Sequence, residues 1–154
     1  MMRVENDILV PEFAEWLSKE KQVYFTPSGV SMRPFIEGDK DSVTLVAMDR
    51  APQRGDIVLA LVKASNGNKT YVLHRLVRIE NHQSSIIYVL QGDGNLSGEE
   101  ICRREDIIGR VVAIDTPQGR RKRLTRGFLW HRLFPLRRYL LKIYRHTWLK
   151  WNYK

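Results

Sequence analysis

The chain has 154 residues, of which 43% are hydrophobic and 28% are charged, and its formal net charge is +9. These proportions are typical of a soluble globular protein and exclude a disordered chain, and the length suits one domain with an appendage. The single cysteine, Cys102, excludes an internal disulfide framework and has no Cys or His neighbour at metal-ligand spacing. We expect no cofactor and no metal, and we take Cys102 as a small core residue.

The N-terminal segment carries acidic side chains where an export signal needs an apolar stretch, namely Glu5, Asp7, Glu12 and Glu15. No window of the chain approaches the roughly 18 apolar residues of a transmembrane helix. We therefore expect a cytoplasmic protein. Residues 11–20 begin with Pro11 and place Phe13, Trp16 and Leu17 on one face, which predicts a short helix.

From residue 22 the pattern is typical of β-strands. Six stretches are rich in β-branched and aromatic residues and are separated by Gly, Asn, Asp and Pro, namely 22–26, 42–48, 56–62, 70–79, 84–90 and 106–114. Between two of them, Ser65-Asn66-Gly67-Asn68 is a hairpin turn signal. We predict a mainly β fold built as a bent antiparallel sheet or partly open barrel, with a short N-terminal helix and a C-terminal amphipathic helix.

A serine-rich loop precedes the second of these stretches, with the sequence Thr26-Pro27-Ser28-Gly29-Val30-Ser31-Met32-Arg33-Pro34. A serine hydroxyl becomes a useful nucleophile when a base takes its proton and backbone N–H groups hold the oxyanion. A glycine beside the serine suits that close backbone approach. Taken alone, Ser-Gly-x-Ser is more often an ordinary turn, and the flanking segments favour the nucleophile.

Several segments in order resemble the conserved boxes of signal peptidase I and the self-cleaving repressors. These are Ser28 to Pro34 with Gly38-Asp39, Arg54 to Val58, Val72 to Val77, Gln91 to Asn95, and Ile108 to Val111. The resemblance spans about residues 26–114 and implies a signal-peptidase-like fold with serine endopeptidase activity. It implies Ser31 as nucleophile and His74 as general base, as in the endoplasmic-reticulum-type enzymes, where bacterial relatives place lysine.

The acidic partner of His74 is left open between two residues. The resemblance places a carboxylate at or just beyond the Gly-Asp-x-Asn segment, where the chain offers Asp93 and then Gly98-Glu99-Glu100. Asp93 and Glu99 are rival orienters of the imidazole, and we take Asp93 as the third catalytic residue. Because Val30 separates Gly29 from Ser31, Ser28 does not simply inherit an oxyanion-hole role.

The Ser31/His74 pair is chemically coherent at neutral pH. A histidine with an ordinary pKa near 6.5 is largely neutral at pH 7 and accepts the serine proton without deep burial. The alternative is a histidine packed on a sheet face, which would leave a catalytically silent peptide-binding or regulatory module. We expect His82 to lie in an exposed turn, and His131 and His146 to belong to the polar face of the tail. Asp39 and Asp56 follow glycine and are interpreted as turn-forming residues.

The basic character belongs to the C-terminal tail. Residues 120–154 contain 12 Lys and Arg and no Asp or Glu, which leaves 14 basic against 17 acidic side chains in the other 119 residues. With the turn signal Thr116-Pro117-Gln118-Gly119, this predicts a peptidase domain over 1–119 and a separate tail over 120–154.

The tail has the pattern of an amphipathic helix that bends near Pro135. Its apolar face is formed by Leu129, Leu133, Leu136, Leu140 and Ile143, widened by Tyr144, Trp148 and Trp151, and Arg138, Lys142 and Arg145 lie opposite. Tryptophan and leucine facing basic side chains favour an anionic membrane surface as the partner of residues 128–151, at the inner face of the membrane. Docking of the helix on protein is the alternative. Nucleic acid is an unlikely partner, since phosphate binding has no use for an apolar face. The expected substrate is a peptide or precursor protein.

Overall fold

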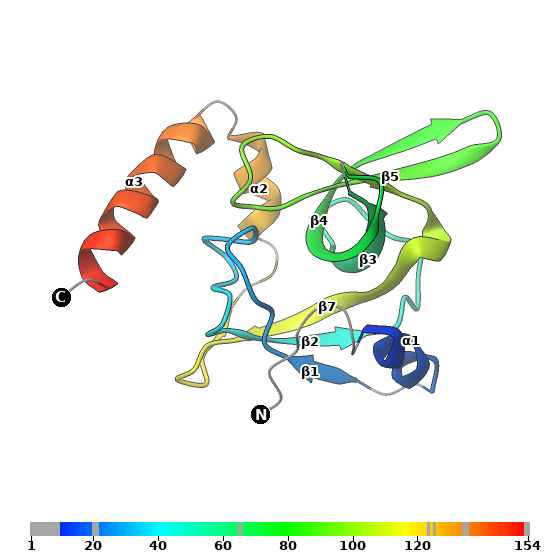
Figure 1. Ribbon diagram of the computed structural model, residues 1–154, viewed down its shortest axis with the longest axis horizontal. Coiled ribbons are helices and arrows are strands. Elements are labelled where there is room, and N and C mark those ends of the chain that lie inside the picture. The colour runs from blue at the N-terminus through cyan, green and yellow to red at the C-terminus, as the bar shows by residue number, and fades with distance from the viewer. Residues whose placement is uncertain are drawn as a thin grey trace.

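The computed structural model describes residues 10–19, 22–64, 66–122, 124, 126–133 and 136–152. Its eight strands are β1 Val23–Phe25, β2 Ser42–Val46, β3 Ile57–Lys63, β4 Lys69–His82, β5 Ser85–Gln91, β6 Glu100–Cys102, β7 Ile107–Asp115 and β8 Arg121–Lys122. They form one antiparallel sheet in the order β1-β2-β7-β3-β4-β5-β6, with β8 paired to β7, and the sheet does not close on itself (Figure 1). The helices are α1 Val10–Ser18, the 3-10 turn η1 Arg104–Asp106, α2 Arg126–Arg132 and α3 Leu136–Asn152.

All six predicted strands and the antiparallel mainly β class are confirmed. The predicted N-terminal helix is α1, and the tail is helical as α2 and α3. Ser65 in the predicted turn and Pro135 at the predicted bend lie outside the described residues. Two strands were missed, β6 and β8, because they are only three and two residues long and carry charged side chains.

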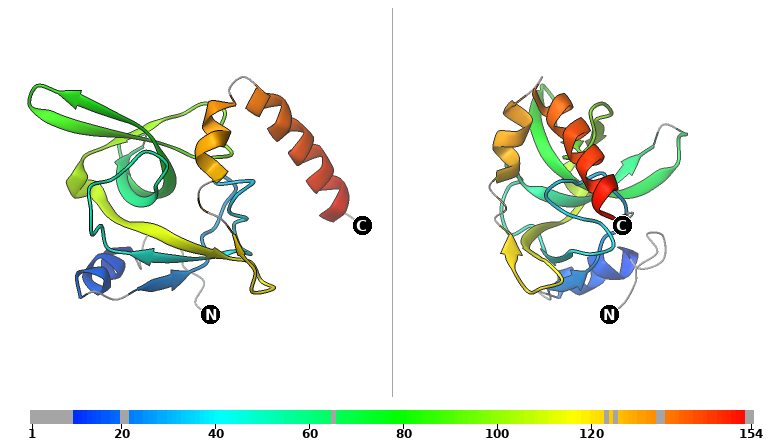
Figure 2. Two further views of the ribbon diagram at one scale, coloured as in Figure 1. Left: turned by 180° about the vertical axis from the view of Figure 1, so that it is seen from behind. Right: turned by 90° about the vertical axis from the view of Figure 1, so that its left-hand side faces the viewer.

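The sheet bends because three of its strand pairings contain a bulge, at Thr44/Leu45, Leu59/Ala60 and Leu76/Arg78. A bulge adds local twist and lets a strand change direction. Strand β7 pairs with β2 near one end and with β3 near the other, and so joins the two halves of the sheet. Figure 2 shows the resulting curl from two further sides.

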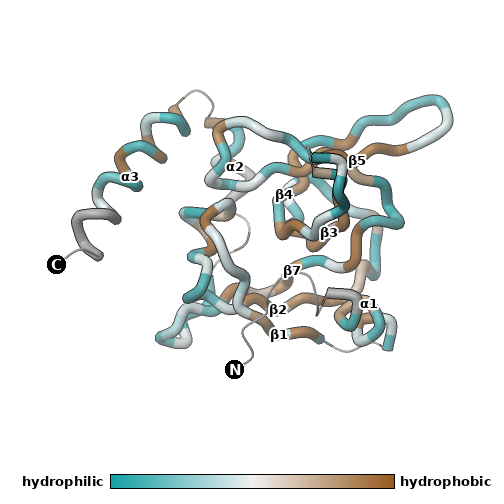
Figure 3. The backbone as a smooth tube through the Cα atoms, viewed as in Figure 1, coloured by the Kyte–Doolittle hydropathy of each residue, from teal (hydrophilic) through white to brown (hydrophobic). Residues whose placement is uncertain are grey.

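Strand β3 is buried on both faces. It contributes side chains to two hydrophobic clusters, because successive side chains of a strand point to opposite faces. Ile57 and Leu59 join a cluster that α1 completes with Phe13 and Leu17. Val58, Ala60 and Val62 join a second cluster with residues of β4, β5 and β6. The hydrophobic strands stand out in Figure 3 against polar connections.

The tail helices pack against the turn that follows β5. Leu141 of α3 is 1% exposed, and the Trp130 indole Nε1 of α2 donates to the Asp93 carbonyl at 2.8 Å. The Tyr144 hydroxyl donates to Glu37 Oε2 at 3.1 Å, and burial raises the pKa of Tyr144 to about 12. The tail after residue 119 is therefore held against the rest of the protein by side-chain contacts from both of its helices. No described helix is both long enough and apolar enough to cross a membrane.

A matched pair of leucines in α3 tests this docking. Leu141 is 1% exposed and Leu136 is 59% exposed. We expect Leu141→Ala to lower the free energy of unfolding by about 2–5 kcal/mol, as for other buried leucines, and Leu136→Ala to change it by less than about 0.5 kcal/mol. Urea unfolding followed by tryptophan fluorescence measures both. Equal effects of the two substitutions would show that α3 is not held against the body of the protein in solution.

Candidate active site

The loop that carries Ser31 connects β1 to β2 and is anchored in the core. Met32 and Ile36 are buried in the cluster beneath α1, and the Ile36 amide donates to the Met32 carbonyl at 3.0 Å in a tight turn. A Cβ atom on Gly38 would overlap the Gly29 carbonyl, so only glycine permits this crossing of the loop. Lys122 of β8 also binds the loop, because its Nζ donates to the Phe35 carbonyl at 3.1 Å.

A second turn, Gly92-Asp93-Gly94, holds the Ser31 backbone directly. The Gly94 amide donates to the Ser31 carbonyl at 2.7 Å. A Cβ atom on Gly94 would lie 2.8 Å from the Val30 carbonyl, so the two segments approach too closely for any larger residue. The position of Ser31 therefore depends on where this turn sits.

His74 is buried on β4, and its partner is neither of the two carboxylates predicted from the sequence. Its Nδ1 lies 2.9 Å from Glu100 Oε2. A carboxylate accepts hydrogen bonds, so this contact suits the tautomer of the neutral ring with its proton on Nδ1 and its lone pair on Nε2. Within the described part of the chain Nε2 makes no hydrogen bond. This is the tautomer that a general base requires.

The carboxylates of Asp93 and Glu99 bind arginines and not His74. The two Asp93 carboxylate oxygens accept from Arg75 Nε at 2.8 Å and Arg75 Nη2 at 2.7 Å. Because Arg75 follows His74 in β4, the two side chains leave the strand on opposite faces, and Asp93 lies on the wrong face to orient the imidazole. Glu99 pairs with Arg78 at 3.0 Å, with both side chains largely exposed.

The Asp93 carboxylate is the centre of a buried polar cluster that includes the tail. It is 0% exposed, and Oδ1 also lies 2.7 Å from His131 Nε2. Arg137 donates to His131 Nδ1 at 2.9 Å, so His131 is the tautomer that donates through Nε2 to Asp93. The sequence interpretation of His131 as part of an exposed polar face is wrong, since this ring is mostly buried and fully bonded.

Electrostatics in the cluster favour an ionised Asp93. Burial raises the pKa of Asp93, but hydrogen bonds from His131 and Arg75 outweigh it, and the net pKa lies below the ordinary value of 3.8. Arg137 is 2% exposed and is bonded mainly to neutral groups, among them the Gly92 carbonyl at 3.0 Å. Burial lowers the pKa of Arg137, and the nearby Asp93 charge opposes that effect.

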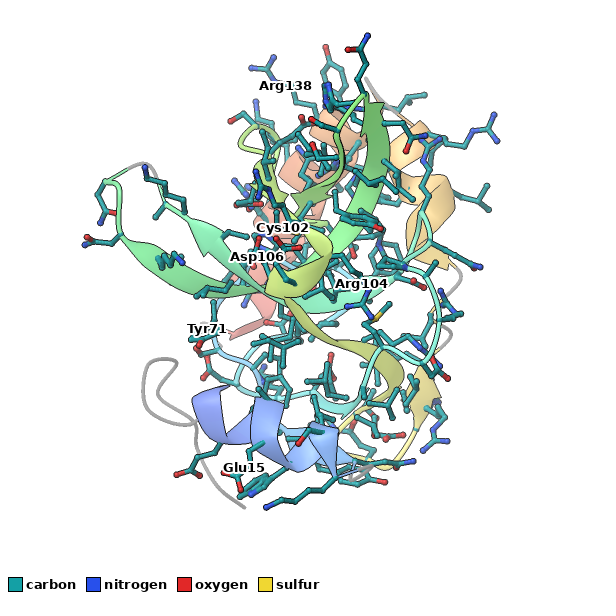
Figure 4. All side chains as sticks on the ribbon, turned by 90° about the vertical axis from the view of Figure 1, so that its right-hand side faces the viewer. Glu15, Tyr71, Cys102, Arg104, Asp106 and Arg138 are labelled. Atoms are coloured by element: carbon teal, nitrogen blue, oxygen red, sulfur yellow. The ribbon has the colours of Figure 1, made fainter. Side chains whose placement is uncertain are left out.

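Ser31 and His74 line one cavity of about 120 Å³, together with Ser28 and Gly29. Its other walls are mostly apolar, from Phe13, Phe25, Pro27, Met32, Ile36, Leu59, Tyr71, Val72 and Leu73. Figure 4 shows Tyr71 between the β3–β4 hairpin and α1. Among the described residues, no hydrogen bond joins Ser31 to His74, and the backbone N–H groups of residues 28–32 donate to no other backbone group.

The remaining predicted residues fall as follows. Asp56 accepts from the Gln53 amide at 2.8 Å and pairs with Arg50, which confirms its turn role. Asp39 has a positive φ of 64°, in a turn. Cys102 is buried as predicted, and burial raises the pKa of its thiol to about 12, so it stays protonated. In the described ranges no three His, Cys, Asp or Glu side chains gather as a metal site.

Comparison of the chain with family models, with curated proteins and with solved structures finds no match. The family suggested by the sequence boxes thus rests on those boxes alone.

Proposed function

We propose that the chain is a serine endopeptidase of the signal-peptidase-like type, with Ser31 as nucleophile, His74 as general base and Glu100 as the residue that orients His74. The observation that carries the proposal is the cavity that Ser31 and His74 share, with the His74 ring fixed from behind by Glu100 at 2.9 Å. The ordered boxes of the sequence support the same assignment.

In the proposed reaction, His74 Nε2 takes the Ser31 proton as Oγ attacks the carbonyl carbon of a peptide bond. The tetrahedral oxyanion is held by backbone N–H groups of residues 28–32, which donate to no backbone group of the described residues. His74 then donates the proton to the leaving amine, which leaves an acyl-enzyme on Ser31. Water deprotonated by His74 hydrolyses the ester. Glu100 stabilises the imidazolium that forms in both steps.

The walls of the cavity favour a small apolar side chain next to the scissile bond. A dry apolar cavity of about 150 Å³ admits benzene, and this cavity of about 120 Å³ is smaller. Phe25, Met32 and Leu59 offer no charge to pair with an acidic or basic side chain. The substrate class is thus a peptide or precursor protein with a small uncharged residue at the cleavage site.

One observation favours the second candidate, a silent peptide-binding module. Ser31 and His74 are not hydrogen-bonded in the structure, and a module that only binds peptides needs no such bond. Catalytic hydrogen bonds are often long without substrate and tighten when it binds, so the two candidates are separated by activity.

We expect Ser31→Ala and His74→Ala each to reduce peptide cleavage by about a millionfold, because nucleophile and base act as one unit. The measurement is cleavage of a mixed synthetic peptide library, read by mass spectrometry. Ser97→Ala and His82→Ala are matched controls, since both residues are exposed and lie away from the cavity. Identical product patterns from wild type and Ser31→Ala, with peptide binding retained, would replace the peptidase by the binding module.

Two neighbouring glutamates test the assignment of Glu100. We expect Glu100→Gln to lower kcat by about 10³–10⁴-fold, because the amide no longer holds the correct tautomer of His74. Glu99→Gln removes the same charge one residue away, from a side chain that pairs with the exposed Arg78, and its kcat is expected within about twofold of wild type. Circular dichroism controls for folding. If Glu99→Gln lowered kcat as much as Glu100→Gln, the assignment of Glu100 as the residue that orients His74 would be wrong.

Asp93 should matter for stability in a pH-dependent way. Its folded pKa lies below its ordinary value, so it stabilises the fold above about pH 3.8, and this contribution is lost as pH falls through the folded pKa. Asp93→Asn leaves Arg75 buried without a carboxylate and is expected to cost about 3–5 kcal/mol at pH 7. Urea unfolding from pH 7 to pH 3 should show the wild-type advantage narrowing at the acid end. A constant gap would mean that folding does not lower the pKa of Asp93, and a gap that widens toward acid pH would mean that the carboxyl is protonated in the fold.

A further inference from the structure

The face of α3 that docks on the protein coincides with the apolar face predicted from the sequence only at Tyr144. Arg137, Leu141 and Tyr144 contact the body, at spacings of four and three residues. Of the predicted apolar face, Leu136, Leu140 and Ile143 lie on another side of the helix, and the side chains of Trp148 and Trp151 lie outside the described residues. The first three remain between 38% and 67% exposed, together with Tyr139, as a stripe of Leu136, Tyr139, Leu140 and Ile143.

The α3 stripe is part of a wider gathering of exposed apolar side chains on the tail. Leu129 of α2 and Leu133 just after it are 62% and 44% exposed. The other large exposed hydrophobic side chains of the described residues are spread over α1, the loops and several strands. Scattered apolar residues need no explanation, whereas a concentrated patch marks an interaction surface. Figures 1 and 2 show α3 at the outer edge of the molecule, where such a patch is accessible.

Basic side chains flank the α3 stripe. Arg138 and Lys142 are exposed one turn apart on the same helix, and His146 follows one turn later. Arg138 is labelled in Figure 4 at the end of the molecule remote from α1. No acidic residue occurs between positions 120 and 154, so nothing in the tail neutralises these cations. An apolar stripe beside cations on one helix is the composition of a segment that lies in the plane of a lipid interface.

The charge and the hydrophobicity of the tail surface can be compared with three kinds of partner, namely nucleic acid, a second copy of the chain and anionic lipid. A nucleic acid would use the cations but leave the leucines in water. A second copy of the chain would cover the leucines but bring two uncompensated basic tails together. Anionic lipid satisfies both, because its headgroups attract Arg and Lys while the acyl boundary takes apolar side chains. We propose that α2 and α3 form a peripheral binding surface for anionic membranes, with Leu136, Tyr139, Leu140 and Ile143 entering the lipid interface.

The docked side of α3 links this surface to the nucleophile loop. Tyr144 donates to Glu37, and Arg145 Nη2 donates to the Gly94 carbonyl at 3.3 Å, on the turn that holds Ser31. A membrane-bound α3 therefore keeps the loop close to the lipid surface without being released from the protein. The inference itself concerns binding and does not depend on catalysis.

The test is co-sedimentation of the full chain with vesicles of phosphatidylcholine alone or mixed with phosphatidylglycerol. We expect binding only to the anionic vesicles, weakening as salt is raised but not vanishing. Leu140→Gln with Ile143→Gln should weaken binding by about tenfold or more, since each apolar side chain loses its burial. Arg138→Gln with Lys142→Gln should weaken it by about tenfold at low salt.

Two matched control variants remove the same groups elsewhere. Ile86→Gln with Ile101→Gln takes two exposed apolar side chains from β5 and β6, and Lys63→Gln with Lys69→Gln takes two exposed charges from the β3–β4 hairpin. Both should bind vesicles like wild type. All four variants should unfold at the wild-type urea concentration, because the substituted side chains are exposed.

Three outcomes overturn the proposal. The first is no binding to anionic vesicles at low salt, and the second is equal loss in the control variants. The third is light scattering that shows a dimer which Leu140→Gln with Ile143→Gln converts to a monomer, since the stripe is then covered by a second copy. In the first outcome, binding of single-stranded RNA assigns the tail to nucleic acid instead.

Discussion

The buried ion pair between Arg75 and Asp93 is the constraint on which the rest of the site depends. Removing two charges from water costs several kcal/mol for each ion and is compensated only when the remaining hydrogen-bonding groups are satisfied. Here Arg75 also donates to the Gly55 carbonyl, and Asp93 also accepts from His131. The pair thus fixes the turn after β5 against β4 and against the tail at once. Because the Gly94 amide of that turn binds the Ser31 carbonyl, the nucleophile loop is located by an ion pair that takes no part in the proposed chemistry.

Two consecutive residues of β4 have different roles because successive side chains of a strand point to opposite faces. Arg75 faces Asp93 on one side of β4, and His74 faces Glu100 on the other. The side chain of His74 therefore makes no contact with the carboxylate that holds the fold. In the proposed reaction, His74 would gain and lose a proton without breaking a hydrogen bond of Asp93.

The sequence predicted what depends on local pattern and missed what depends on register. The six longer strands were recognised because β-branched residues fill them. Ser31 and His74 line one cavity, and their catalytic roles stay a prediction. Glu100 was missed in favour of Asp93 and Glu99, because the choice needs the pairing of β6 with β5, where Glu100 lies opposite Leu90. One clue was present, since a core Cys102 places Glu100 on the same inward face by the two-residue period. The helix of the tail was equally clear from its spacing, but its contact face was not, because an arginine lies at the centre of that face.

The tail docks with hydrogen-bond donors on its inner face and leucines on its outer face, and the surface on which it docks explains why. The turn after β5 presents carbonyl oxygens of Gly92, Gly94 and Asn95 and the carboxylate of Asp93, all of which are acceptors. A helix packed there must supply donors, and guanidinium and indole groups do so, whereas leucine side chains would leave those acceptors unsatisfied at a cost of about 1–3 kcal/mol each. Donors therefore occupy the inner face, with Leu141 filling the space between them. The leucines and isoleucine on the outer face contribute little to the fold and expose apolar area that lowers solubility. The membrane surface proposed for the tail would cover this apolar area, and its negative charge would match the cations beside it.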